Sequence, residues 1–152
     1  MKRTTALFLA AVVIGLSACG SGGGGGASLS PPAFTNMAGT RWNQTDTVSS
    51  TNSCNVGLGV TDPFVLHVLA QSGNTISVYD ERSGSGSATN ATISGYGISY
   101  TGSRYPVGGC INMTASYSVT LNNAETAYTG SATITCLDNG CTVPVSVSAT
   151  KI

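Results

Sequence analysis

The chain has 152 residues, only 8% of which are charged, and its six basic and six acidic residues balance to a net charge of zero. Because no acidic or basic run occurs, the composition argues against a nucleic-acid partner held through its phosphates. It also leaves few groups that could transfer protons, which argues against an enzyme.

The first 18 residues have the layout of a secretory signal peptide. Two basic residues follow the initial methionine, an apolar run extends from residue 6 to 16, and the small Ser17 and Ala18 precede Cys19. The apolar run is shorter than a typical membrane-spanning helix. The sequence therefore predicts export of the chain to a compartment where its other cysteines can be oxidised.

Leu16-Ser17-Ala18-Cys19 resembles the lipobox of bacterial lipoproteins, in which an aliphatic residue and two small ones precede an obligatory cysteine. The resemblance implies cleavage before Cys19 and acylation, by chains such as palmitate, of its thiol and its new amino group. It also implies sorting to the outer membrane, because Gly20 stands where an Asp commonly retains enterobacterial lipoproteins in the inner membrane. We therefore expect a lipid anchor in the outer membrane, on either its periplasmic or its cell-surface side. An ordinary signal peptide followed by a chance cysteine is the alternative.

The composition divides the chain into three parts. Residues 1–18 are the expected signal peptide, and residues 19–33 are the lipidated cysteine and a Gly/Ser/Pro tether of flexible composition. Residues 34–152 remain, roughly 120 residues that suit one domain with a modest core.

The domain is predicted to consist of short strands, because Thr, Val, Ile and Tyr alternate with Gly-rich turns and no helical period occurs. The last three strands show a strict alternation of apolar and polar residues, with a hairpin signal at Asn139-Gly140 between the final two. In chain order the eight predicted strands cover residues 43–48, 64–70, 75–80, 88–94, 97–101, 111–121, 128–135 and 143–150.

Eight short sequential antiparallel strands favour an all-β, up-and-down barrel, since closure removes exposed strand edges. Pro144 argues against closure, because proline cannot donate to a strand ladder and is typical of an edge. An open meander or a β-sandwich is therefore the alternative fold.

Gly39-Thr40-Arg41-Trp42 at the start of this meander resembles the first strand of lipocalins, whose Gly-x-Trp motif places the Trp at the closed base of the barrel. One more residue separates Gly39 from Trp42 than in that motif. The resemblance implies a lipocalin-like barrel that holds a small apolar ligand.

Four cysteines remain besides Cys19, and two disulfides are expected. In an eight-stranded barrel all four lie at the same end. Closure favours Cys54–Cys141 with Cys110–Cys136, because it makes the last strand a neighbour of the first. The hairpin parity favours Cys136–Cys141 with Cys54–Cys110, and both sets stay open.

Five residues combine apolar area with a polar tip or a flexible shape and are the candidate ligand contacts: Trp42, Tyr100, Met113, Tyr117 and Tyr128. Filling the core is their alternative role. The small residues Ala115, Gly130 and Ala132 on the inward face are expected to leave room for a cavity, with its mouth among the cysteines.

No catalytic, metal or cofactor site is predicted. The single histidine, His67, lies in an apolar strand without a nucleophile motif nearby, and no Cys-x-x-Cys pair occurs. The carboxylates lie in or near predicted loops, and Asp80-Glu81-Arg82 is expected to be a solvated turn. Two functions remain: a lipoprotein that binds a small hydrophobic ligand, or a structural or interaction protein of the cell envelope with a filled barrel. Its protein partners are not identified by the sequence.

Overall fold

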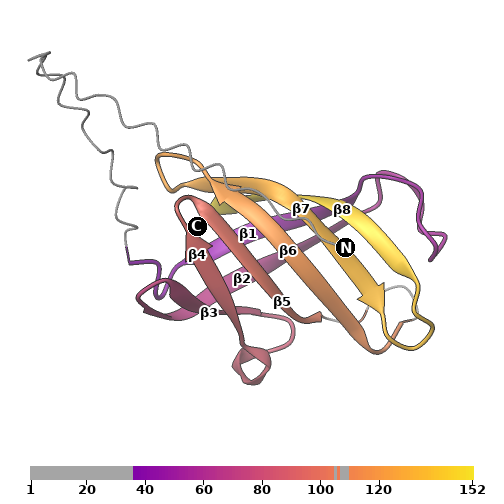
Figure 1. Cartoon of the computed structure of the whole chain (residues 1–152), viewed down its shortest axis with the longest axis horizontal. Helices are drawn as coiled ribbons and strands as arrows, with labels where there is room; N and C mark the ends of the chain where they lie inside the picture. The colour runs from indigo at the N-terminus through magenta and orange to yellow at the C-terminus, as the bar shows by residue number, and fades with distance from the viewer. Residues whose placement is uncertain (1–35, 105, 107–109) are drawn as a thin grey trace, which may run out of the picture.

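Eight antiparallel strands form one closed barrel in the computed structural model, which describes residues 36–104, 106 and 110–152 (Figure 1). Each strand pairs with the next one in the chain, and the last pairs with the first. The strands are β1 (Arg41–Val48), β2 (Thr61–Ser72), β3 (Thr75–Asp80), β4 (Thr89–Ser94), β5 (Gly97–Arg104), β6 (Met113–Leu121), β7 (Ala127–Cys136) and β8 (Thr142–Lys151). A 3-10 turn, η1 (Ser85–Ser87), lies between β3 and β4. The predicted signal peptide and tether, including Cys19, lie outside the described residues.

All eight predicted strands are present, and the up-and-down barrel is confirmed. Pro144 pairs with Thr133 of β7, and its carbonyl accepts a hydrogen bond from the Ser49 N–H at 3.1 Å. The N–H and C=O of a strand residue point to the same side, so the missing donor of Pro144 also faces Ser49. At Ser49 strand β1 has already ended and the chain is exposed to solvent. Pro144 therefore lies just beyond the paired part of β1 and β8, and its missing N–H does not prevent the barrel from closing. The open meander and the sandwich are therefore wrong.

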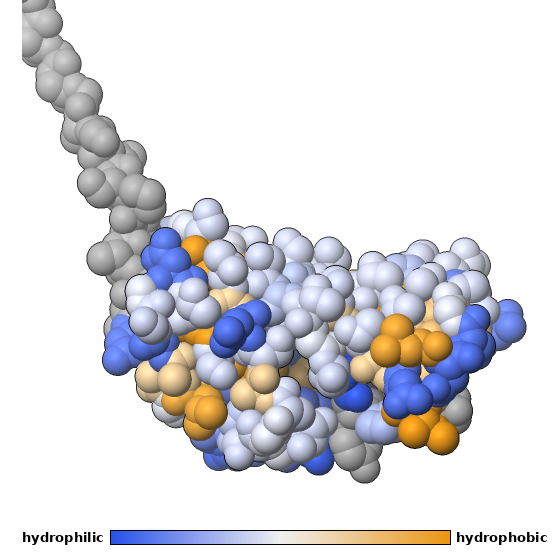
Figure 2. Space-filling view, turned by 60° about the horizontal axis from the view of Figure 1, so that its bottom comes forward, coloured by the Kyte–Doolittle hydropathy of each residue, from blue (hydrophilic) through white to orange (hydrophobic). Residues whose placement is uncertain are grey.

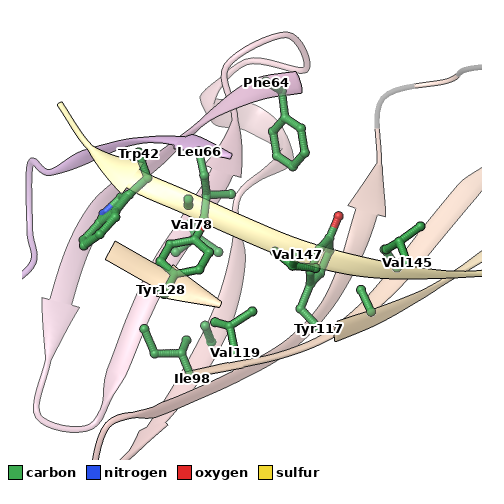
Figure 3. Packing of buried hydrophobic residues seen from close by; sticks show 14 of the residues in the cluster. Trp42, Phe64, Leu66, Val78, Ile98, Tyr117, Val119, Tyr128, Val145 and Val147 are labelled. Atoms are coloured by element: carbon green, nitrogen blue, oxygen red, sulfur yellow. The ribbon is translucent and has the colours of Figure 1, made fainter. Parts of the chain in front are cut away.

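The interior of the barrel is filled by alternate residues of all eight strands. Figure 3 shows Trp42 of β1, Leu66 of β2 and Tyr128 of β7 pointing into the same space. The gaps in this part of the barrel have volumes of only about 10 and 20 Å³. The alternation of the sequence thus points apolar side chains inward and leaves Ser and Thr on the outer face, which is pale over its middle in Figure 2. Within the described residues no helix has the length and apolar character needed to cross a membrane.

The segment before β1 closes one end of the barrel, which we call the base. Met37 is buried there, and its N–H donates to the side-chain oxygen of Gln71 at 2.7 Å. Trp42 lies just inside, with its ring nitrogen donating to Thr40 Oγ1 at 3.0 Å and the Lys151 ammonium 5.8 Å from its ring centre. Trp42 therefore lies at the closed base, where the resemblance to lipocalins places it.

Candidate functional site

A cavity of about 360 Å³ lies at the opposite end of the barrel, which we call the open end. This end carries the β1–β2 loop, the chain between β5 and β6, and the β7–β8 turn (Figure 1). Much of the wall is apolar, formed by Val48, Val56, Val60, Met113, Ile134, Val143 and Val145. A charged wall, formed by Asp46, Asp62 and Arg104, completes the interior. An apolar chamber with a few convergent polar groups has the general character of a small-molecule site.

Two disulfides lie at the mouth of this cavity. They join Cys54 to Cys141, with Cα atoms 5.1 Å apart, and Cys110 to Cys136, with Cα atoms 5.9 Å apart. The pairing predicted from barrel closure is confirmed, and the one predicted from hairpin parity is wrong. Closure brings β8 beside β1 and β6 beside β7, so each bridge connects neighbouring segments. All four cysteines line the cavity, as expected for residues at one end of the barrel.

The charged wall continues into a hydrogen-bonded network inside the barrel. Arg104 of β5 and Asp46 of β1 form an ion pair, with Nη1 2.7 Å from Oδ2. Both side chains are almost fully buried, with only 3% and 1% of their surface exposed. The Tyr117 hydroxyl donates to the same carboxylate at 2.8 Å, and Gln44 Nε2 donates to its other oxygen at 2.7 Å. Tyr128 donates in turn to the Gln44 side-chain oxygen. Each oxygen of Asp46 therefore has a partner within the protein.

The network also extends toward solvent through Asp62. Its carboxylate pairs with Arg104 on one side and with Arg82 Nη1 on the other, the latter at 2.7 Å. Arg82 also holds Asp80, with Nη2 2.6 Å from Oδ2. The expected turn is present at residues 81–83, but the expectation that residues 80–82 are solvated is wrong, because Asp80 is buried and Arg82 donates to both Asp80 and Asp62.

Arg104 combines a contact with an aromatic ring and a hydrogen-bond donor without a partner. Its guanidinium lies 4.8 Å from the centre of the Phe64 ring, and the Arg82 guanidinium lies at the same distance from that ring. Its Nε is the one buried side-chain nitrogen or oxygen among the described residues that has no hydrogen-bond partner. A buried donor without a partner is costly, so this nitrogen is the point at which the network is incompletely satisfied.

The network contains one more carboxylate than it has guanidinium groups. Three carboxylates (Asp46, Asp62, Asp80) face two guanidiniums (Arg82, Arg104). Burial raises the pKa of the Asp46 carboxyl, and the Arg104 charge and the bonds from Gln44 and Tyr117 offset this only in part. Burial also raises the pKa of the Tyr117 hydroxyl, which keeps this group protonated and able to donate.

The five candidate ligand contacts fall into two groups. Met113 lines the cavity. Trp42 and Tyr128 pack near the base with ring centres 5.2 Å apart, and Tyr100 stacks on Tyr117 at 4.6 Å in the middle of the barrel. These four residues do not line the cavity.

The small inward residues do not create the cavity, contrary to expectation. Ala115 and Ala132 are buried in the filled part of the barrel and do not line it. Gly130 serves a different purpose: a Cβ there would lie 2.2 Å from the Ser118 carbonyl oxygen of β6. The glycine therefore allows two backbones to approach closely. The open space lies instead at the barrel end, among valine and cysteine side chains and beneath loops.

The remaining polar candidates lie outside the cavity interior or have structural partners. His67 lies on the outside of β2, with Nδ1 2.8 Å from the Tyr79 hydroxyl. Asp138 accepts the backbone N–H groups of Ile111 and Asn112 at 2.9 and 3.1 Å. Cys110, Cys136 and Asp138 have the proximity of a metal site, but both sulfurs belong to one disulfide and offer no thiolate.

The buried network was not predicted, although the sequence contains a signal for it. Gln44 and Asp46 share the parity of Trp42 and Val48 on β1, so an inward Trp implies two inward polar residues. Asp62 shares the parity of the inward Phe64 on β2. Arg104 shares the parity of the inward Ile98 on β5. Four polar residues on the inward face of a closed barrel require one another as partners.

No family model matches the chain, and neither a curated protein nor a solved structure matches it.

Proposed function

We propose that the protein is a lipid-anchored envelope lipoprotein whose lipocalin-like barrel binds a small, largely apolar ligand without chemically changing it. The observation that supports this most strongly is the cavity of about 360 Å³ at the open end. Pockets that bind small molecules have volumes of roughly 300–1,000 Å³. The eight-stranded up-and-down order is also the one expected of a lipocalin-like carrier.

The walls indicate the chemistry of the ligand. Its body should be apolar, to contact the seven valine, methionine and isoleucine side chains. One end should carry a hydrogen-bond acceptor, because Arg104, whose guanidinium has only donor groups, lines the cavity. A neutral acceptor such as an ester, ketone or hydroxyl oxygen suits the site better than a carboxylate. Asp62 and Asp138 also line the cavity, and their charges would repel an anion.

The anchor is proposed from the lipobox alone. Cleavage before Cys19, with acylation of the new N-terminus, would attach the barrel to the outer membrane through the tether of residues 19–33. Growth with labelled palmitate should label the full chain but not the Cys19→Ser variant. Equal labelling of both chains would contradict the anchor.

Native mass spectrometry of the domain that begins at Ser30, purified gently from its own host, tests ligand binding. We expect an additional mass that disappears on denaturation. In the Val143→Trp variant the indole should fill the cavity and remove this mass. The matched control is Ser146→Trp, which places the same ring on the outer face of β8 and should keep the ligand.

A second function remains, that of a structural or interaction protein of the envelope. The filled middle and base of the barrel favour it. A bare protein mass in the wild-type domain, lighter than the reduced chain only by the hydrogens of two disulfides, would support it against the carrier.

A further inference from the structure

The open end of the barrel exposes large apolar side chains around the cavity. Leu58 of the β1–β2 loop is 73% exposed, Ile111 before β6 is 74% exposed, and Leu137 of the β7–β8 turn is 62% exposed. Val56 and Val60 of the β1–β2 loop are also exposed. We call these five residues the rim.

The three segments that carry the rim are held to one another. The Cys54–Cys141 bridge joins the β1–β2 loop to the β7–β8 turn. The Leu137 N–H donates to the Asn112 carbonyl at 2.8 Å, next to Ile111. The rim is therefore fixed in place by the fold, so its apolar side chains incur little additional ordering cost when they meet a surface.

Apolar surface continues from the rim into the cavity. Val56 and Val60 are exposed to solvent and also line the cavity. A small apolar ligand could thus pass from an outer apolar phase to the inner wall along these side chains. A ligand taken from water would not require such a path.

Charge at the open end restricts what the rim can meet. Arg41 and Lys151 lie at the base. Arg104 lines the cavity, and Arg82 pairs with Asp62, which also lines it, but both guanidiniums are held by carboxylates of the internal network. Asp138 is the exposed charge beside the cavity. Figure 2 shows apolar atoms among hydrophilic ones at its right-hand end, which is the open end in Figure 1. At the open end, exposed apolar tips with no largely exposed cation among the described residues there suit an uncharged lipid surface better than an anionic one.

We propose that the rim docks on the surface of a zwitterionic lipid bilayer, where the barrel loads or releases its ligand. This inference rests on the proposed carrier function and extends it to the source of the ligand. The geometry of the anchor allows it. About 17 residues separate Cys19 from the described domain and span at most about 60 Å. The longest strand, β2, has 12 residues and a length of about 40 Å. The open end can therefore reach the bilayer to which the other end is tethered.

The test measures cosedimentation of the domain that begins at Ser30 with phosphatidylcholine vesicles. This domain lacks Cys19, so it carries no acyl chain, and it contains every strand of the closed barrel. We expect it to bind, equally at low and high salt. The Leu58→Ser/Ile111→Ser/Leu137→Ser variant should lose more than about tenfold of the vesicle partition coefficient. Its thermal midpoint should stay close to that of the wild type, because all three side chains are exposed.

The matched control removes apolar side chains from the other end. Leu69 and Ile152 are 48% and 57% exposed near the base, and Leu69→Ser/Ile152→Ser should bind vesicles as the wild type does. The inference is overturned by a wild-type domain that binds no better than the triple variant, or by an equal loss in the control. Binding restricted to phosphatidylglycerol vesicles and abolished by salt also overturns it. So does a self-associated dimer that the triple substitution abolishes while vesicle binding is unchanged.

One further variant separates this inference from the carrier function. Val143→Trp should abolish uptake of the fluorescent apolar probe N-phenyl-1-naphthylamine and leave vesicle binding unchanged. If the wild type fails to bind the probe or any native ligand while rim-dependent vesicle binding persists, the carrier function falls and the docking surface stands. If probe binding persists without vesicle binding, the docking surface falls alone.

Discussion

Arg104 and Asp46 lie on strands that are not adjacent in the barrel, β5 and β1, and meet as an ion pair across its interior. Breaking a buried pair by removing one partner costs about 3–5 kcal/mol, because it leaves the other charge without compensation. We expect Arg104→Met to lower the free energy of unfolding by about 3 kcal/mol in urea titrations. In the double variant Asp46→Asn/Arg104→Met the loss should be smaller than the sum of the two single losses. Additive losses would contradict a direct coupling.

The pH dependence of stability should reveal Asp46. Burial raises the pKa of this carboxyl above its ordinary value of 3.8, so the folded state binds its proton more tightly than the unfolded chain does. Its contribution to stability is then fully present below about pH 4 and is lost as the pH rises through the folded-state pKa. We therefore expect the stability of the wild type relative to Asp46→Asn to decrease from about pH 4 toward neutral pH.

Asp138 should show the opposite dependence of stability on pH and serves as a control. Hydrogen bonds from the Asn112 side chain and from the backbone of Asn112 and Ile111 lower the pKa of Asp138. Its contribution is present above the ordinary pKa and is lost as the pH falls. The stability of the Asp138→Asn variant relative to Asp46→Asn should therefore still decrease from about pH 4 toward neutral pH. Thermal midpoints recorded from pH 4 to 8 would show a pH-independent difference between wild type and Asp46→Asn if the assignment were wrong.

The two disulfides should differ in their contribution to stability. The Cys54–Cys141 bridge closes a separation of 87 residues, and Cys110–Cys136 one of 26. In the chain-entropy account the longer loop stabilises more, by about 1 kcal/mol. We expect Cys54→Ser/Cys141→Ser to unfold at a lower urea concentration than Cys110→Ser/Cys136→Ser. The reverse order would show that local contacts at the mouth outweigh loop entropy.

Gly130 should tolerate no side chain. A Cβ at this position would lie 2.2 Å from the Ser118 carbonyl oxygen and 2.6 Å from the Val119 Cα. Because both are backbone atoms of the neighbouring strand, relief requires a shift of the sheet. We expect Gly130→Ala to lower the free energy of unfolding by about 2 kcal/mol or more. Gly86→Ala, where a Cβ meets nothing within 4 Å, should leave the thermal midpoint unchanged.

The sequence alone determined the number and order of the strands and which residues share a face, because alternation is a local property. It did not determine which of the two faces points inward. Eight sequential strands favoured barrel closure, and closure favoured the disulfide pairing that the structure shows, but the sequence left the rival fold and the rival pairing open. Parity also implied the inward placement of Gln44 and Asp46, although neither residue was predicted to face the interior.

Only the tertiary structure decided where space remains inside the barrel. The cavity is the space that side chains of β1, β2, β5, β6, β7, β8 and their connections leave unfilled at one end, and its volume depends on side chains that meet across the interior. No local pattern identifies Arg104 as the partner of Asp46 and Asp62, because β5 meets these residues of β1 and β2 only across the interior of the closed barrel. The tertiary structure also decides why Pro144 is tolerated. Its missing N–H faces β1, a strand far away in the sequence, and β1 has already ended at that point.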